Sequence, residues 1–159
     1  VQTCALPILH PESAISIREM LAPRAAVITP NVFEAAQLSG LRTIRSLDDM
    51  KEAAARIHNL GARNVLIKGG AKLDTPSAVD VLYDGEAFEV LESPKIDTTY
   101  THGAGCTYAA AITAGLAKGQ SVREAVHQAK QFITIALKHS FPLNAYVGPT
   151  CHAAHRLHR

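Results

Sequence analysis

The sequence predicts an α/β fold in which helices are layered on a sheet, and three observations support this. Two short runs rich in β-branched residues, 25–31 and 64–70, each end in residues that form loops. Segments with a helical spacing of apolar residues lie between and after these runs. Residues 78–92 alternate apolar with polar side chains, as a β-hairpin does. Parallel strands with helical crossovers, extended at one side by the hairpin, account for this order.

The first half of the chain contains three predicted helices and the first predicted strand. The segment 10–25 contains a helix that ends before Pro23, and the strand over 25–31 is closed by Pro30. A short helix over 32–40 stops at its terminal glycine. A longer helix runs from Ser46 to Leu60, where Gly61 is a C-terminal stop.

The second half begins with the predicted strand 64–70, which ends in a lysine and two glycines. The hairpin that follows turns at Asp84-Gly85, which we expect to form a two-residue turn. A glycine loop then leads into a helix rich in small residues, a composition that indicates close packing on a sheet. Ser121 and Glu124 form a capping box that opens the last long helix.

Composition limits the class of protein. The chain has 159 residues, of which 47% are hydrophobic and 19% charged, and its net charge is +2. These values fit one globular domain and speak against a nucleic-acid partner, which requires a clustered basic surface. No apolar run reaches the ~20 residues that span a bilayer, so we expect no membrane partner. Three scattered cysteines, Cys4, Cys106 and Cys151, favour thiols in a reducing cytoplasmic compartment.

Residues 1–9 differ in composition from a targeting segment. Residues 1–9 lack the basic and hydrophobic parts of a signal peptide, and no initiator Met precedes them. We therefore expect the chain to be a fragment in which 1–9 is a leader that is not native.

The glycine loop "THGAGC", residues 101–106, suits an anion. Glycines let successive N–H groups point into one concavity, and the following helix adds its positive end. A phosphate or a phosphoryl group in transit fits such a site. Cys106 falls in the first turn, where the same field favours a thiolate. The alternative is a plain turn with a packed cysteine, and this stretch alone does not decide between the two.

Two other motifs lie at predicted strand ends, where α/β sheets bind ligands. In "TPNVFE", Asn31 and Glu34 lie one helical turn apart and offer oxygen ligands to a hydrated Mg²⁺. Alternatively, Asn31 is an N-cap and Glu34 its capping-box partner. The run "IKGG" places Lys68 and a flexible backbone beside a strand end, which suits nucleotide phosphates, although such turns are common.

Other polar residues support weaker interpretations. His102 is a loop residue that orients the turn rather than a proton carrier. The spacing of His152, His155 and His158 hints at a metal, but a solvated tail accounts for it better. Three aspartates are interpreted as polar residues of the hairpin and loops, namely Asp80, Asp84 and Asp97.

The motifs together resemble one family. "ITPNVFEAAQL", "NVLIKGG", "DVLYDG" and "DTTYTHGAGCTYAAAITAGLAKG" are similar to the vitamin-kinase branch of the ribokinase-like fold. That branch contains hydroxymethylpyrimidine (phosphate) kinases and a class of pyridoxal kinases. The ending "FITIALKHSFPLNAYVGPT" and the form "GAGC" resemble the pyridoxal kinases of the Bacillus type.

The resemblance implies a three-layer α/β/α sandwich that is truncated at its N-terminus, so that 10–159 is the C-terminal part of a single domain. It implies a kinase that transfers phosphate from ATP, with Mg²⁺, to a hydroxymethyl group. It implies an anion hole made by the N–H groups of Gly103, Ala104, Gly105 and Cys106. Cys106 holds the last position of the loop, where many ribokinase-like enzymes have an aspartate as general base. It assigns Mg²⁺ to Asn31 and Glu34. The residues it assigns to nucleotide binding are Lys68, Gly70, Thr101, Ala129 and Lys130.

The resemblance also frames the alternatives. Its substrates are small vitamins, pyridoxal or pyridoxine in the leading hypothesis and hydroxymethylpyrimidine in the second. A third hypothesis is a nucleotide-binding module without catalysis. Members of the family run to about 250–280 residues, typical of one α/β domain, so this chain would lack about half of the substrate site. Members of the family commonly form homodimers. Tyr100 departs from the polar residue that is usual at its position.

Overall fold

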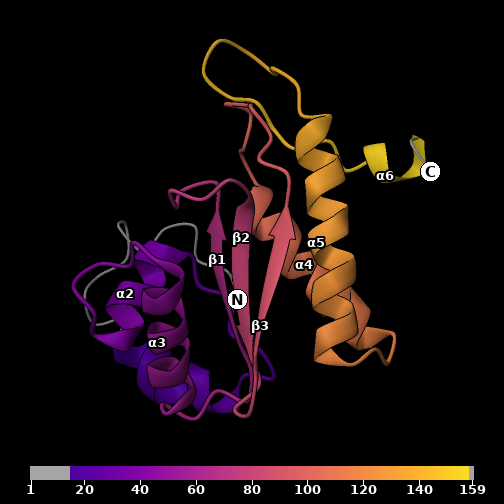
Figure 1. Cartoon of the computed structure of the whole chain (residues 1–159). Helices are drawn as coiled ribbons and strands as arrows, with labels where there is room; N and C mark the ends of the chain where they lie inside the picture. The colour runs from indigo at the N-terminus through magenta and orange to yellow at the C-terminus, as the bar shows by residue number, and fades with distance from the viewer. Residues whose placement is uncertain (1–14, 158–159) are drawn as a thin grey trace. The chain divides into compact units, whose positions relative to one another are not determined.

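The computed structural model describes residues 15–157, which form two compact units, 15–92 and 93–157. The leader expected over 1–9 lies outside the described residues, as do Cys4 and His158. Figure 1 labels the helices and strands of both units. Each unit is described by itself.

The first unit opens with irregular helical turns. Residues Ile17–Leu21 form a π-helical turn, η1, and Ala22–Arg24 form a 3₁₀ turn, η2. The helix was expected to end before Pro23, but the helical turns continue through it. Pro23 stands in the first turn of η2, where its missing N–H costs no hydrogen bond.

Two capped helices follow. Helix α2 spans Val32–Ser39 and ends at Gly40 with φ 74°, and helix α3 spans Leu47–His58. Ser46 caps α3 by accepting a hydrogen bond from the N–H of Asp49 at 3.1 Å. Both helices pack against the sheet of this unit (Figure 1), and their apolar faces supply its core. The largest fully buried side chains there are Met50, Ile57, Val65, Ile67 and Val81.

The sheet of the first unit consists of β1 and the expected hairpin. It has three strands in the order β1 (Val65–Gly70), β2 (Ala78–Tyr83) and β3 (Phe88–Ser93). Strand β1 pairs with β2 in the antiparallel sense. The hairpin therefore extends the sheet at one side of β1, as expected.

The predicted strand over 25–31 is an extended segment rather than a regular strand. It makes two parallel bridges to β1, Ile28 with Val65 and Asn31 with Lys68. The N–H of Ile28 donates to Asn64 at 3.0 Å, and the carbonyl of Pro30 accepts from Lys68 at 2.8 Å. Because Pro30 has no N–H for the next bond of the ladder, the pairing is interrupted. The parallel pairing that we expected between 25–31 and 64–70 is therefore present, in the form of two isolated bridges.

The hairpin turn is longer than the two-residue turn predicted at Asp84-Gly85. Four residues, 84–87, separate the strands, and Gly85 has φ 100°. The carboxylate of Asp84 accepts hydrogen bonds from the N–H groups of Glu86 and Ala87 at 2.9 and 2.8 Å. This side-chain bonding organises the longer loop.

The second unit is built on two long helices, α4 (Ala104–Ala117) and α5 (Val122–Lys138), with a short α6 (Ala154–Leu157). The small residues of α4 permit close packing against α5: a Cβ on Gly115 would lie 2.8 Å from the Cβ of Ala125. The predicted capping box is present, with Glu124 bonded to the N–H of Ser121 at 2.9 Å. No helix within 15–157 is long and apolar enough to cross a membrane.

Candidate active site

Within the first unit, the structure brings together the two motifs that were expected at strand ends. Asn31 pairs with Lys68 across the parallel bridge, so the motifs "TPNVFE" and "IKGG" lie side by side. Glu34 stands on the first turn of α2, three residues after Asn31. The gathering arises because the segment 28–31 and β1 run in the same direction and end at the same edge.

Asn31 and Glu34 form the capping box that was the alternative to a metal site. The Oδ1 atom of Asn31 accepts from the N–H groups of Phe33 and Glu34 at 2.9 and 3.0 Å. The Oε2 atom of Glu34 accepts from the N–H of Asn31 at 2.9 Å. Glu34 is only 7% exposed. This geometry is compatible with a hydrated Mg²⁺, because a carboxylate has two oxygens and Mg²⁺ retains several waters.

The Lys68-Gly69-Gly70 turn interrupts the register between β1 and β2. Lys68 stands opposite Asp80, but Gly70 stands opposite Val79, so the ladder contains a bulge. Gly70 adopts φ 54°, and a Cβ on Gly69 would lie 2.4 Å from the carbonyl oxygen of Val79. Both glycines are therefore required by the local backbone.

Asp80 is the residue of this region that sequence reasoning missed. It was interpreted as a polar residue of the hairpin, but its side chain is 2% exposed and its Oδ1 accepts from the N–H of Gly70 at 3.2 Å. The available signal was an aspartate inside the apolar run "AVDVLY", since aspartate is uncommon in strands.

Within the second unit, the glycine loop leads directly into α4, as predicted. Gly103 has φ 78° and precedes the helix as its N-cap residue. The carbonyl of Gly103 accepts from Thr107 at 2.8 Å. Cys106 therefore falls in the first turn, and its side chain is exposed. The thiol therefore lies at the N-terminus of α4, where the helix dipole is positive.

One of the four N–H groups expected in the anion hole is already engaged. The N–H of Ala104 donates to the carbonyl of Thr101 at 3.1 Å, which closes the turn that starts the helix. Thr101 is exposed at the edge of this turn. An anion could therefore bond the N–H of Ala104 only if this bond opened, and the assignment of the N–H groups of Gly103, Gly105 and Cys106 stays a prediction.

The two residues expected near adenine lie on α5. Ala129 is 1% exposed and Lys130 is 8% exposed. The side chain of Ala129 is thus part of the packed face of α5, and the carbonyl of Lys130 accepts from the hydroxyl of Thr134 at 2.8 Å.

The segment after α5 returns to the start of α4 and holds it. His102 makes a parallel bridge with Pro149, in which its N–H donates to Gly148 at 3.1 Å and its carbonyl accepts from Thr150 at 3.3 Å. The Nε2 atom of His152 lies 2.8 Å from the hydroxyl of Thr107, the residue after Cys106. The solvated-tail interpretation concerned the histidines: His152 is exposed and His155 is half-buried, whereas Thr150 and Ala154 beside them are buried.

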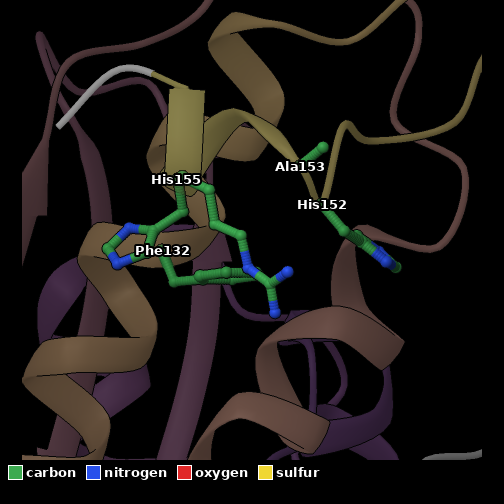
Figure 2. Close-up of a pocket in the computed structure, with 5 residues that line it drawn as sticks. Phe132, His152, Ala153 and His155 are labelled. Atoms are coloured by element: carbon green, nitrogen blue, oxygen red, sulfur yellow. The ribbon is translucent and has the colours of Figure 1, made fainter.

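A separate hollow of about 380 Å³ lies between α5 and the C-terminal segment. Figure 2 shows His155 beside Phe132 there, with ring centroids 5.4 Å apart. The residues that line it are Phe132, His152, Ala153, His155 and Arg156. The set includes none of the predicted catalytic, nucleotide or metal residues. No three His, Cys, Asp or Glu side chains within residues 15–157 gather to hold a metal.

Comparison with known proteins identifies the class and then the family. The glycine loop that opens α4 and the Asn-x-x-Glu turn at the strand edge are the motifs on which the resemblance to small-molecule kinases of the ribokinase-like fold rests. Residues 2–151 match the phosphomethylpyrimidine kinase family, and the chain belongs to it. The ribokinase-like α/β fold class expected from the resemblance is confirmed.

Three relatives locate the chain within this family. It is 63% identical over 152 residues to a pyridoxine kinase of Bacillus subtilis, covering 96% of this chain and 56% of the relative. It is 44% identical over 147 residues to a hydroxymethylpyrimidine/phosphomethylpyrimidine kinase of the same species, covering 92% and 54%. The crystal structure of B. subtilis pyridoxal kinase with ADP matches at a TM-score of 0.92 and 64% identity, covering 95% and 58%. The chain thus spans about half the length of the relatives it matches.

Proposed function

We propose that this chain carries the nucleotide and phosphoryl-transfer part of a kinase that phosphorylates the hydroxymethyl group of pyridoxal or pyridoxine, using ATP and Mg²⁺. The observation that carries the proposal is the start of α4, where a left-handed glycine precedes a helix with an exposed Cys106 in its first turn. The higher identity to a pyridoxine kinase, 63% against 44%, favours vitamin B6 over the pyrimidine.

The proposed chemistry assigns a role to residues of each unit. Phosphoryl transfer requires stabilisation of charge and positioning of an alcohol rather than covalent work by the protein. The N–H groups of Gly103, Gly105 and Cys106 stabilise negative charge on the transferred group, assisted by the α4 dipole. Cys106 lies where a base would accept the proton of the substrate hydroxyl.

The remaining predicted residues act on the nucleotide side. Asn31 and Glu34 would hold Mg²⁺ through water, and the bound metal would neutralise phosphate charge. Lys68 and the backbone of Gly70 would face the nucleotide phosphates, and Thr101, Ala129 and Lys130 would border the nucleotide. ADP in the B. subtilis pyridoxal kinase crystal supports an adenine nucleotide as the phosphate donor.

Two alternatives remain as outcomes of one experiment. The family match and the 44% identical relative favour a hydroxymethylpyrimidine kinase, and the short span favours a nucleotide-binding module. The product of the complete reading frame and the 159-residue chain should each be assayed with ATP, Mg²⁺ and either vitamin. We expect pyridoxal to be phosphorylated by the product of the reading frame. Phosphorylation of the pyrimidine alone would contradict the proposal. ADP binding by the 159-residue chain without turnover would support the module for this chain.

A further inference from the structure

We propose that Asp80 is a positioning residue for the bulge at Lys68–Gly70, the end of β1 that we assign to nucleotide binding. It acts as a hydrogen-bond acceptor for the N–H of Gly70. The proposal rests on the proposed function, because it assigns the turn to nucleotide binding. It adds a residue of strand β2 to a site otherwise built from strand ends and loops.

The first argument is the burial of the Asp80 carboxylate. The side chain is 2% exposed, and its neighbours in β2 are Val79, Val81 and Leu82. Burying a carboxylate costs free energy unless hydrogen bonds compensate it. If this position were needed for packing alone, an aliphatic residue like its neighbours would fill it. A buried carboxylate here therefore indicates a requirement for an acceptor.

The second argument is the backbone that this acceptor holds. The Oδ1 atom of Asp80 accepts from the N–H of Gly70 at 3.2 Å, immediately after the break in register. Two successive glycines have little intrinsic preference for one backbone conformation. The bond from Gly70 to Asp80 compensates for this freedom by fixing the end of the bulge.

The third argument is the place of the bulge beside the predicted metal residues. The N–H of Lys68 donates to Pro30 at 2.8 Å, and Lys68 pairs with Asn31 in the parallel bridge. Lys68 is thus fixed on one side by the segment that carries the capping box. Asp80, its cross-strand partner, fixes the turn from the other side. Strand β1 therefore contacts the Asn31 motif on one side and the strand that carries Asp80 on the other.

The test compares three variants that separate acceptor, charge and fold. Asp80→Asn retains an oxygen acceptor without the charge, and Asp80→Val replaces the carboxylate with the residue type of its neighbours. Asp84→Asn is the matched control, because Asp84 is the exposed aspartate of the same hairpin. The measurements are ADP affinity by calorimetry, exchange of the Gly70 amide by NMR, and KM and kcat in the product of the complete reading frame.

We expect Asp80→Val to weaken ADP binding and to speed Gly70 exchange by about tenfold each, the effect of losing one buried hydrogen bond. The KM for ATP should rise while the KM for pyridoxal stays constant. Asp80→Asn should stay within about threefold of the unsubstituted protein, and Asp84→Asn should match it. Unchanged ADP affinity and Gly70 exchange in Asp80→Val would overturn the proposal.

Two further outcomes are decisive. If Asp80→Val does not fold, Asp80→Asn decides: a tenfold loss of ADP affinity in that variant would show that charge, not acceptance, matters, and would overturn the proposal. If the unsubstituted protein binds no ADP, the proposed function fails. Exchange of the Gly70 amide would then still show whether Asp80 holds the turn.

Discussion

His152 and Thr107 are joined by a hydrogen bond of 2.8 Å between Nε2 and the hydroxyl oxygen, although 45 residues separate them in the sequence. Thr107 is buried at the end of the first turn of α4, directly after Cys106. The bond therefore ties the C-terminal segment to the helix start on which the proposed chemistry depends. Thr150, whose hydroxyl lies 3.5 Å from that of Thr107, adds a second contact at the same place.

This bond can be measured by a double-mutant cycle. We expect His152→Ala and Thr107→Val each to lower the free energy of unfolding, with a coupling energy of about 1 kcal/mol between them. Denaturant unfolding of the single and double variants gives this value. Thr113→Val is the matched control, because the hydroxyl of Thr113 bonds the carbonyl of Ala109 in the same helix. Strict additivity of His152→Ala with Thr107→Val would refute the coupling.

Cys106 can be tested apart from nucleotide binding. We expect Cys106→Ala to lower turnover by about 10²–10⁴-fold, the usual contribution of a proton-transfer group, and to change ADP affinity less than twofold. Steady-state kinetics and calorimetry provide the two values. Cys151→Ala is the control, since Cys151 is half-buried and its N–H bonds the carbonyl of Ala136. Wild-type turnover in Cys106→Ala would exclude the thiol from the transfer step.

Glu34 separates capping from metal binding. Glu34→Gln retains an acceptor for the N–H of Asn31, so we expect the free energy of unfolding to change by less than about 0.5 kcal/mol. Loss of the charge should weaken Mg²⁺-dependent ADP binding about tenfold. Calorimetry with Mg²⁺ and with a chelator measures the difference. Asn31→Ala should instead destabilise the protein by about 1 kcal/mol, because the cap is lost. Equal ADP affinity of Glu34→Gln with Mg²⁺ would restrict Glu34 to capping.

The capping box of α5 predicts a pH dependence of stability. Hydrogen bonds from the side chain and then the backbone of Ser121 lower the pKa of Glu124 from its ordinary value of 4.5. Since the folded pKa lies below the unfolded one, the stabilisation is present above pH 4.5 and is lost as the pH falls through the folded pKa. Ser121→Ala should raise the pKa of Glu124 toward 4.5. The free energy of unfolding should then depend less on pH below pH 4.5.

An NMR titration checks this shift, and Asp49 serves as an internal reference. The pKa of Asp49 is lowered first by the backbone N–H of Arg45 and then by Ser46, at the start of α3. It should not move in Ser121→Ala. A pKa of Glu124 that is the same in both proteins would show that Ser121 is not the cause.

The parts of the fold that could be predicted are those set by near neighbours in sequence. The boxes at Asn31–Glu34 and Ser121–Glu124 depend on side chains three residues apart, and the start of α4 depends on its adjacent glycines. The pairing of β1 was not predictable in this way, because a strand pattern does not specify its partner or its direction. The pairing of His152 with Thr107 had no local signal. Burial of Asp80 follows from the same sheet pairing.

The bridge between His102 and Pro149 has a consequence for the order in which the protein is made. A ribosome releases the glycine loop and α4 well before residue 149, so the loop emerges without the two backbone bonds that later hold it. The contact closes a long loop of chain and forms late for entropic reasons. Cleavage by a protease between α5 and Pro149 would loosen the same bonds. Integrity of the last segment is thus a condition for an ordered helix start nearly fifty residues earlier.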